Sequence, residues 1–321
     1  MKKSQAEGKP MKRTIIWTRV RSTAFIAAPA GAQLTEEPHF HHAHLNVVDI
    51  DASIAYYEKI FGAPRIKFRD IADAVLTDRS FFLFNKVDKP APWEMISGIY
   101  HLGWGGVNGP SEFEWRDKLG VEWQTGLNSL GENYYMYAYG PDKEVVEVWT
   151  GFRHNRFGHV HLFSDDVKAA TEWYVENLGV KGPARIAPKP PKAPAEFSNG
   201  LATNPGGVFR YLWTSAVSTN NGVTINIFAK PSDDTVNWWS DPPVGDLVAS
   251  DGRVVDHLAF SYRDIEPVFE HMKKNGVEIV KPIRHDESLN MKSFFVRGPD
   301  KVLIEIVEAR PLPGGVWESK D

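Results

Sequence analysis

The residues best suited to chemistry are histidines and glutamates that recur at matching places along the chain. Each half of the sequence has two histidines that open apolar, strand-like segments and one glutamate inside a later apolar segment. They are His42, His101 and Glu147 in the first half, and His159, His257 and Glu305 in the second half. A carboxylate in so apolar a strand is costly to bury unless it is paired or bound to a metal. Two imidazoles and one carboxylate on one face of a divalent metal leave positions open for substrate and O2. The sequence therefore predicts a metal triad in each half.

Two further histidines follow a predicted ligand by two residues. His44 follows His42, and His161 follows His159. Because side chains two apart in a strand point to the same face, both should face the predicted metal. They are candidates for acid–base groups or for hydrogen-bond donors to a substrate oxygen. The alternative is that they are packed histidines or partners of the ligands.

A fourfold repeat places these residues on elements. In each repeat an Asp or Asn follows the opening histidine by seven residues, and a helix-like segment then runs to a glycine. The four polar residues are Asp49, Asn108, Asp166 and Asp264, and the four glycines are Gly62, Gly120, Gly179 and Gly276. Asp and Asn are preferred at helix N-caps, and glycine is preferred just after the last turn. The spacing thus predicts four modules, each with a strand, a helix and several more strands. Modules one and three resemble each other, as do modules two and four.

The repeat resembles the vicinal oxygen chelate superfamily, which groups glyoxalases, bleomycin-resistance proteins and extradiol dioxygenases. The resemblance covers about residues 39–310. It rests on the strand histidine with its following Asp, on a helix with an aromatic-Tyr pair such as Tyr56-Tyr57, and on the final strand from Gly298 to Glu305. It implies an α+β fold of two tandem domains, each a pair of βαβββ modules that form a half-open barrel around a metal. The expected domains are 39–152 and 153–313, with tails at 1–38 and 314–321.

Within the superfamily, the sequence is most similar to the type I extradiol dioxygenases. Glyoxalase-type sites take a second carboxylate from the last strand of the first module in each pair, and neither Phe81 to Asn85 nor Thr224 to Phe228 contains a glutamate. The extradiol resemblance implies Fe(II) or, less often, Mn(II), whereas a lyase of the same fold would accept Zn(II) or Ni(II). It also implies O2 and a small catechol-like substrate with vicinal oxygens, as in the degradation of aromatic compounds.

The extradiol resemblance extends to catalytic residues, with departures. These enzymes carry a His and a Tyr before the final Glu. His285 stands near the expected place for the His, and the Tyr position holds Phe295 in the second half and Tyr137 in the first. The usual catalytic His between the two ligand histidines is missing between His161 and His257. Which half is active therefore stays open.

Three functions are compatible with the sequence. The first is a metal-dependent dioxygenase of the extradiol kind. The second is a glyoxalase-like lyase or isomerase that uses the metal as a Lewis acid to stabilise an enolate. The third is a binding protein of the resistance type, in which the metal site is vestigial.

Composition narrows the partners and the compartment. The net charge of −4 gives no basic excess for nucleic acid, no apolar run is long enough for a membrane span, and the absence of cysteine excludes thiolate ligands and disulfides. We expect a cytoplasmic protein. Residues 1–38, with an apolar stretch from Ala24 to Ala28, would instead export the chain or send it to an organelle if they act as a targeting signal. The Trp238-Trp239 pair suits a substrate lid or loop packing. The oligomeric state, including a homo-oligomer, stays open.

Overall fold

The computed structural model of the chain describes residues 34–186, 214–230, 245–311 and 317–318. The predictions for a targeting segment and for the Trp238-Trp239 pair fall outside the described residues. The described residues all belong to one compact unit. No helix in the described part of the chain is long and apolar enough to cross a membrane.

The first and fourth modules each contain a strand, a helix and three more strands, as predicted. The first module consists of β1 (His39–Val47), α1 (Ile50–Phe61), β2 (Arg65–Phe68), β3 (Ala72–Leu76) and β4 (Phe81–Lys86). The fourth consists of β12 (Val255–Tyr262), α5 (Glu266–Lys274), β13 (Ile279–Asp286), β14 (Met291–Arg297) and β15 (Leu303–Glu308), with the short helix η3 (Pro299–Lys301) before β15. A small hairpin of β16 (Arg310–Pro311) and β17 (Trp317–Glu318) follows.

The second module has the same order, and the described part of the third contains a strand, a helix and two more strands. The second consists of β5 (Ile99–Gly105), α2 (Gly109–Lys118), β6 (Trp123–Leu130), β7 (Asn133–Tyr139) and β8 (Val145–Trp149), followed by the short helix η1 (Thr150–Phe152). The described part of the third consists of β9 (Phe157–Ser164), α3 (Val167–Leu178), β10 (Thr214–Ser218) and β11 (Thr224–Ala229).

Three of the four predicted helix caps form as expected. The side chains of Asp49, Asn108 and Asp166 each accept a hydrogen bond from a backbone N–H in the first helical turn. Gly62 and Gly179 end α1 and α3 in the left-handed conformation that glycine adopts at little cost. The fourth cap was misplaced by one residue, because α5 begins after Ile265, and Asp264 bonds the N–H of Glu266 from one position earlier.

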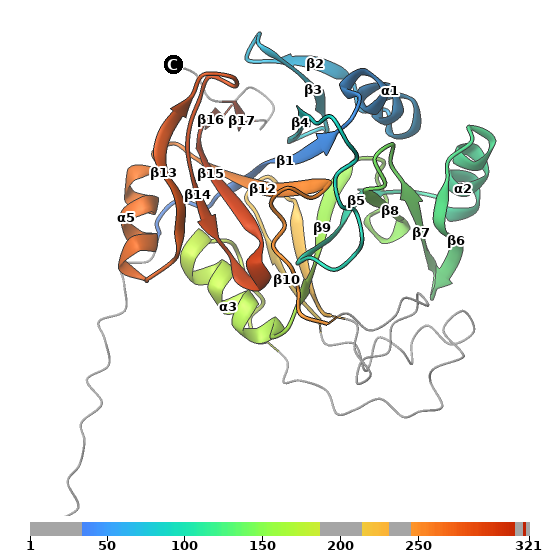
Figure 1. The fold of residues 1–321 in the computed structure, drawn as a ribbon. Helices are drawn as coiled ribbons and strands as arrows, with labels where there is room; N and C mark the ends of the chain where they lie inside the picture. Colours follow the sequence, from blue (N-terminus) through green and yellow to red (C-terminus); the bar gives the residue numbers. More distant parts are fainter. Residues whose placement is uncertain (1–33, 187–213, 231–244, 312–316, 319–321) are drawn as a thin grey trace, which may run out of the picture. The chain divides into compact units, whose positions relative to one another are not determined.

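The modules pair across the two halves of the chain (Figure 1). One sheet has eight strands in the order β13-β14-β15-β12-β1-β4-β3-β2, and the other has seven in the order β10-β11-β9-β5-β8-β7-β6. The first module thus joins the fourth through the antiparallel pair β1–β12, and the second joins the third through β5–β9. Neither sheet closes on itself.

The predicted α+β fold of tandem βαβββ modules in open sheets is confirmed, but the partners of the modules differ from those expected. We expected the first module to share a barrel with the second, and the third with the fourth. Instead, each sheet takes one module from residues 39–152 and one from residues 153–313.

Contacts between the first and second modules tie the two sheets together. Tyr57 on α1 donates a hydrogen bond of 2.7 Å to the buried carboxylate of Glu144, just before β8. The ring of Phe61 packs against the ring of Trp104 on β5, with centroids 4.7 Å apart. Burial raises the pKa of Glu144 to about 7. This part of the core therefore contains a carboxyl group whose charge depends on pH.

Candidate metal centres

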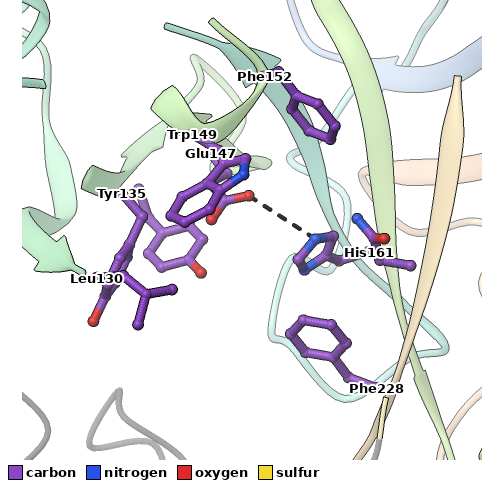
Figure 2. A pocket seen from close by; sticks show the side chains of 9 residues that line it. Leu130, Tyr135, Glu147, Trp149, Phe152, His161 and Phe228 are labelled. Carbon is purple, nitrogen blue, oxygen red and sulfur yellow. Dashed lines mark ion pairs between the residues drawn. The ribbon is translucent and has the colours of Figure 1, made fainter. Parts of the chain in front are cut away.

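A cavity on the seven-stranded sheet contains three of the predicted site residues (Figure 2). Its volume is about 240 Å³, and its walls come from β6, β7, β8, η1, β9 and β11. Apolar and aromatic side chains form most of the wall: Leu130, Tyr135, Tyr137, Trp149, Phe152 and Phe228. Glu147 and His161 supply the carboxylate and the imidazole of the wall. A ligand in the cavity would therefore contact residues to which the sequence assigned a chemical role.

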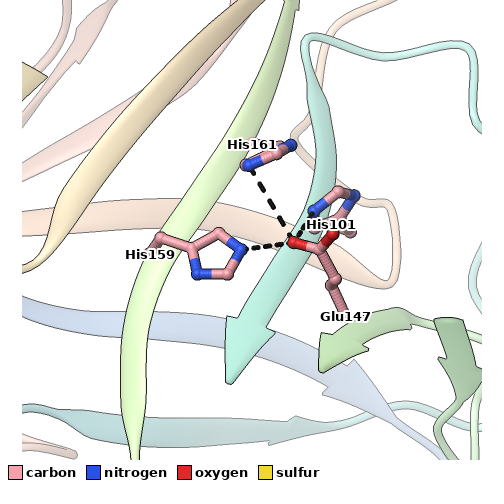
Figure 3. Close-up of side chains that lie close together, drawn as sticks. All are labelled: His101, Glu147, His159 and His161. Carbon is pink, nitrogen blue, oxygen red and sulfur yellow. Dashed lines mark hydrogen bonds and ion pairs between the residues drawn. The ribbon is translucent and has the colours of Figure 1, made fainter. Parts of the chain in front are cut away.

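Strand register gathers four ligand-type residues at the base of this cavity (Figure 3). In the antiparallel pair β5–β9, His101 lies opposite His161, and Gly103 lies opposite His159. In the parallel pair β5–β8, Glu147 lies beside Gly103. We call His101, Glu147, His159 and His161 the seven-strand cluster.

One carboxylate oxygen of this cluster lies close to all three imidazoles. Glu147 Oε2 is 2.6 Å from His159 Nε2, 3.3 Å from His101 Nε2 and 4.0 Å from His161 Nε2. All four side chains are buried. Their ligand atoms lie within 4.8 Å of one another, which is compact enough to surround one ion.

The eight-stranded sheet holds an equivalent set across β1, β12 and β15. Glu305 Oε2 is 3.2 Å from His42 Nε2 and 3.3 Å from His257 Nε2. The ring of His44 stacks on that of His257 with centroids 4.7 Å apart. We call His42, His44, His257 and Glu305 the eight-strand cluster.

All six predicted metal ligands lie in these clusters, but the predicted grouping by halves is wrong. His42 lies with His257 and Glu305, and His159 lies with His101 and Glu147. The reason is the pairing of β1 with β12 and of β5 with β9, which brings together histidines from different halves of the chain.

Burial and mutual contact set the protonation of both clusters. Burial lowers the pKa of His101, His161, His42 and His44, which favours neutral imidazoles. Burial acts to raise the pKa of the two glutamates, but the neighbouring imidazoles outweigh it and hold both values well below the ordinary range. Neutral imidazoles and an ionised carboxylate are the forms that bind metal.

Unpaired ring nitrogens support the fit of a metal to these donors. Within the described residues, the buried Nε2 atoms of His101 and His42 make no aligned hydrogen bond, although they lie 3.3 Å and 3.2 Å from the carboxylate oxygen of their cluster. A buried polar atom without a partner is costly and calls for an explanation. Three imidazoles and one carboxylate suit a divalent transition metal, which would use these nitrogens.

The two clusters differ in the groups behind the ligands. His257 Nδ1 lies 2.6 Å from Asp256 Oδ1, and Asp256 in turn accepts hydrogen bonds from the N–H of Gly252 and from Asn46. Burial lowers the pKa of His257, but Asp256 and Glu305 outweigh it and raise the value to about 9. A carboxylate behind a ligand histidine fixes the ring and increases its basicity. The matching position before His101 holds Tyr100, so the seven-strand cluster has no such carboxylate there.

The two cavities differ as well. The eight-strand cluster opens into a space of about 340 Å³ whose wall is largely polar. Its polar side chains include Asn46, Asn85, Lys281, Arg284, Asp286 and Ser288. The seven-strand cavity therefore suits an apolar ring, and the eight-strand cavity suits a polar ligand.

The four predicted catalytic residues separate into two groups. Tyr137 and His161 line the seven-strand cavity, and His44 lines the eight-strand cavity. Tyr137 is buried, lies beside Glu147 in the pair β7–β8, and has its ring centroid 5.0 Å from that of His101. His285, by contrast, is 40% exposed and lies 3.9 Å from Glu287. Its neighbours Arg284 and Asp286 line the cavity, so strand alternation turns His285 away from the cluster.

Sequence reasoning missed the groups that surround the ligands. His41 Nδ1 lies 2.7 Å from His42 Nδ1, and Asp256 supports His257. His41 and Asp256 each directly precede a predicted ligand in the sequence. This adjacency could have indicated that they support the ligands. The aromatic wall residues Trp149 and Phe152 had no comparable signal, because their place at the cavity depends on the pairing of modules.

Comparisons with known proteins agree with this fold. The family model of the Glyoxalase/Bleomycin resistance protein/Dioxygenase superfamily matches residues 156–306, a little under half of the chain. The solved structure of glyoxalase I from Zea mays is similar, with a TM-score of 0.60 and 15% identity over 84% of this chain and 92% of that chain. A solved "putative dioxygenase" from Bacillus subtilis gives a TM-score of 0.54 and 12% identity over 85% of each chain. No curated protein sequence gives a significant match.

The repeated modules and the open sheets define the fold, and the family match covers the part of the chain that contains the third and fourth modules. Residues 156–306 match the family of glyoxalases, bleomycin-resistance proteins and dioxygenases that the motifs indicated, and the chain is similar in fold to the solved glyoxalase I. The solved structures share its fold. The predicted closeness to extradiol dioxygenases stays a prediction.

Proposed function

We propose that the chain is a metal-dependent dioxygenase that cleaves the ring of a small catechol-like substrate at the seven-strand cluster. The observation that carries this proposal is the cavity of about 240 Å³, whose wall is mainly aromatic and whose base is a buried His/Glu cluster. An apolar pocket with a few convergent polar groups is the usual form of a small-molecule site.

The size and wall of the cavity favour a single aromatic ring. Drug-sized ligands occupy pockets of roughly 300–1,000 Å³, so a smaller space admits one ring with small substituents. Trp149, Phe152 and Phe228 offer ring faces and edges for stacking. With the ring held there, its hydroxyl groups would face Glu147 and His161, the charged or polar end of the cavity.

The metal would be held by His101, His159 and Glu147. When bound, it would supply a Lewis acid for two adjacent substrate oxygens and a redox partner for O2, for which Fe(II) is the best candidate and Mn(II) the alternative. Zn(II) or Ni(II) would supply the Lewis acid alone, as the lyase alternative requires. In ring cleavage one carbon–carbon bond next to a hydroxylated carbon breaks, and both oxygen atoms of O2 enter the product.

Tyr137 is our candidate for a catalytic residue of the chain itself. It lines the cavity beside Glu147, and its hydroxyl is a group that donates a hydrogen bond to a substrate oxygen. The equivalent position beside Glu305 is Phe295, which has no hydroxyl. This difference is a second reason to place ring cleavage at the seven-strand cluster.

Oxygen uptake with a panel of catechols tests the proposal. The experiment compares Fe(II)-loaded wild type with Glu147→Gln and with the matched variant Glu305→Gln, which removes the same charge from the other cluster. We expect uptake of O2 with the wild type, a loss of about 100-fold or more in Glu147→Gln, and uptake largely kept in Glu305→Gln.

Three results would overturn the proposal. Loss of uptake in Glu305→Gln but not in Glu147→Gln would move the reaction to the eight-strand cluster. Turnover of a glyoxalase substrate under argon, with no O2 uptake from any catechol, would establish a lyase. Tight binding of an aromatic compound without turnover would establish a binding protein.

A further inference from the structure

We propose that His161 and His44 are the fourth protein ligands of the two metal centres, so that each centre has three histidines and one carboxylate. The inference deepens the proposed function, because it assumes that the clusters bind metal. It replaces the acid–base role that the sequence suggested for these two histidines.

The first argument comes from the internal symmetry of the strands. The two glutamates occupy one register position, because Glu147 lies beside Gly103 and Glu305 lies beside Ala259 on the neighbouring parallel strand. Gly103 and Ala259 each follow a ligand histidine by two residues. In the other two modules, the matching strand pairs place Asn226 beside His161 and Leu83 beside His44.

In each module, either the last strand carries a glutamate or the first strand carries a second histidine at the neighbouring position. Where the last strand of a module carries a glutamate, the first strand carries Gly or Ala. Where the last strand carries Asn226 or Leu83 in place of a carboxylate, the first strand carries His161 or His44. Each sheet contains one such module. A histidine on the first strand thus accompanies a missing carboxylate on the last strand twice in one chain.

The second argument is steric. A Cβ atom added to Gly103 would lie 2.0 Å from His159 Nε2, so this position must stay small for the His159 ring to enter the cluster. At the equivalent position on β9, the residue is His161, and its ring lies inside the cluster next to the other two imidazoles. Its centroid lies 4.2 Å from that of His101 and 4.9 Å from that of His159.

The third argument is distance. Two ligands with bonds of about 2.1 Å to one metal lie about 3 Å apart when adjacent and about 4.2 Å apart when opposite. His161 Nε2 lies 4.0 Å from Glu147 Oε2, and the four ligand atoms of the seven-strand cluster all lie within 4.8 Å of one another. The same limit holds for the ligand atoms of His42, His44 and His257.

The assignment has consequences for metal choice and for substrate. One carboxylate leaves a divalent ion with net positive charge, whereas two would neutralise it, and an imidazole-rich shell favours Fe, Co, Ni, Cu or Zn over Mg. On an ion with six positions, four protein ligands would leave two for a chelating substrate. His161 is the one of the three histidines that lines the cavity, so it would lie nearest to that substrate.

Metal titration on a chain with one working cluster tests the ligand role without any turnover. His257→Ala with Glu305→Gln disables the eight-strand cluster and serves as the parent. Co²⁺ is the probe, read out by calorimetry and by its visible absorption, which reports coordination number. His161→Ala and the polar His161→Gln are compared with His285→Ala, which removes an exposed imidazole that lines neither cavity.

We expect Co²⁺ affinity to fall by about 100-fold or more in both His161 variants, with a changed absorption spectrum, and to stay at the parental value in His285→Ala. The decisive variant is His161→Ala with Asn226→Glu, which supplies a carboxylate at the register position of Glu147. It should recover most of the lost affinity, which a merely structural role of His161 would not allow.

Affinity and spectrum unchanged in the His161 variants would overturn the assignment, as would a loss that Asn226→Glu does not reverse. Absence of Co²⁺ binding by the parent and the wild type would overturn both this inference and the proposed function. Tight binding with the expected losses, but no O2 uptake from any catechol, would remove the dioxygenase and leave the ligand assignment in place.

Discussion

Gly103 shows how closely one residue can limit a metal site. It lies opposite His159 and beside Glu147, and the His159 ring occupies the space where a side chain at position 103 would start. Ala259 holds the equivalent place in the eight-strand cluster, where a methyl group is accommodated. The two clusters therefore share their ligand types but differ in their tolerance at this position.

We predict that Gly103→Ala weakens metal binding at the seven-strand cluster by about tenfold or more, because the added methyl group displaces the His159 ring from its ligand position. Calorimetric titration with Co²⁺ checks this. Gly126→Ala is the matched control, because a Cβ there meets only the ring of Phe113 at 3.8 Å. Equal affinity for Co²⁺ in Gly103→Ala and wild type would contradict the predicted geometry.

At the scale of elements, a hydrogen bond to the buried carboxyl group of Glu144 connects α1 to the turn before β8. The carboxyl oxygens of Glu144 accept hydrogen bonds from the hydroxyl of Tyr57 and from the N–H of Asp142. Burial raises its pKa from the ordinary carboxyl value to about 7. The folded chain therefore holds a proton on Glu144 that the unfolded chain has already lost at neutral pH.

This linkage predicts how the free energy of unfolding depends on pH. The contribution of Glu144 is fully present below its unfolded pKa, near 4.5, and is lost as pH rises through about 7. Glu144→Gln should remove this dependence and make the chain more stable than wild type at pH 8, by roughly 3 kcal/mol at most.

Urea unfolding at pH 5 and pH 8 measures the difference. Glu132→Gln, on the exposed turn between β6 and β7, is the control and should leave the pH dependence unchanged. If Glu144→Gln keeps the same loss of stability between the two pH values, the buried carboxyl is not its source.

The elements also show what the sequence can predict. Strand histidines, Asx caps and left-handed glycines are local signals, so the four modules and three of their caps follow from residue type and spacing. Which strands meet at the centre of each sheet is not local. The strand propensities of β5 and β12 do not show which of them pairs with β1. The packing of whole modules determines the partner.

At the scale of the whole molecule, the pairing of modules determines the candidate sites. The six residues that the sequence predicts as metal ligands all lie in the two clusters, but the prediction grouped them by halves because the two halves repeat one pattern. The sheets instead assemble each cluster from both halves. One centre then faces an aromatic cavity and the other a polar cavity, a difference that arises from wall residues on separate modules.

Metal content after removal of chosen histidine pairs tests this assembly most directly. The proteins are loaded with Fe(II) without oxygen, dialysed against a weak chelator and analysed by elemental mass spectrometry. Wild type should hold about two ions per chain.

His101→Ala with His159→Ala should hold about one at wild-type affinity, because both changes fall in the seven-strand cluster. His42→Ala with His101→Ala should hold none at wild-type affinity, because each cluster then lacks a ligand. The reverse pattern, with one ion kept by the second pair and none by the first, would contradict the assembly of the clusters across the two halves.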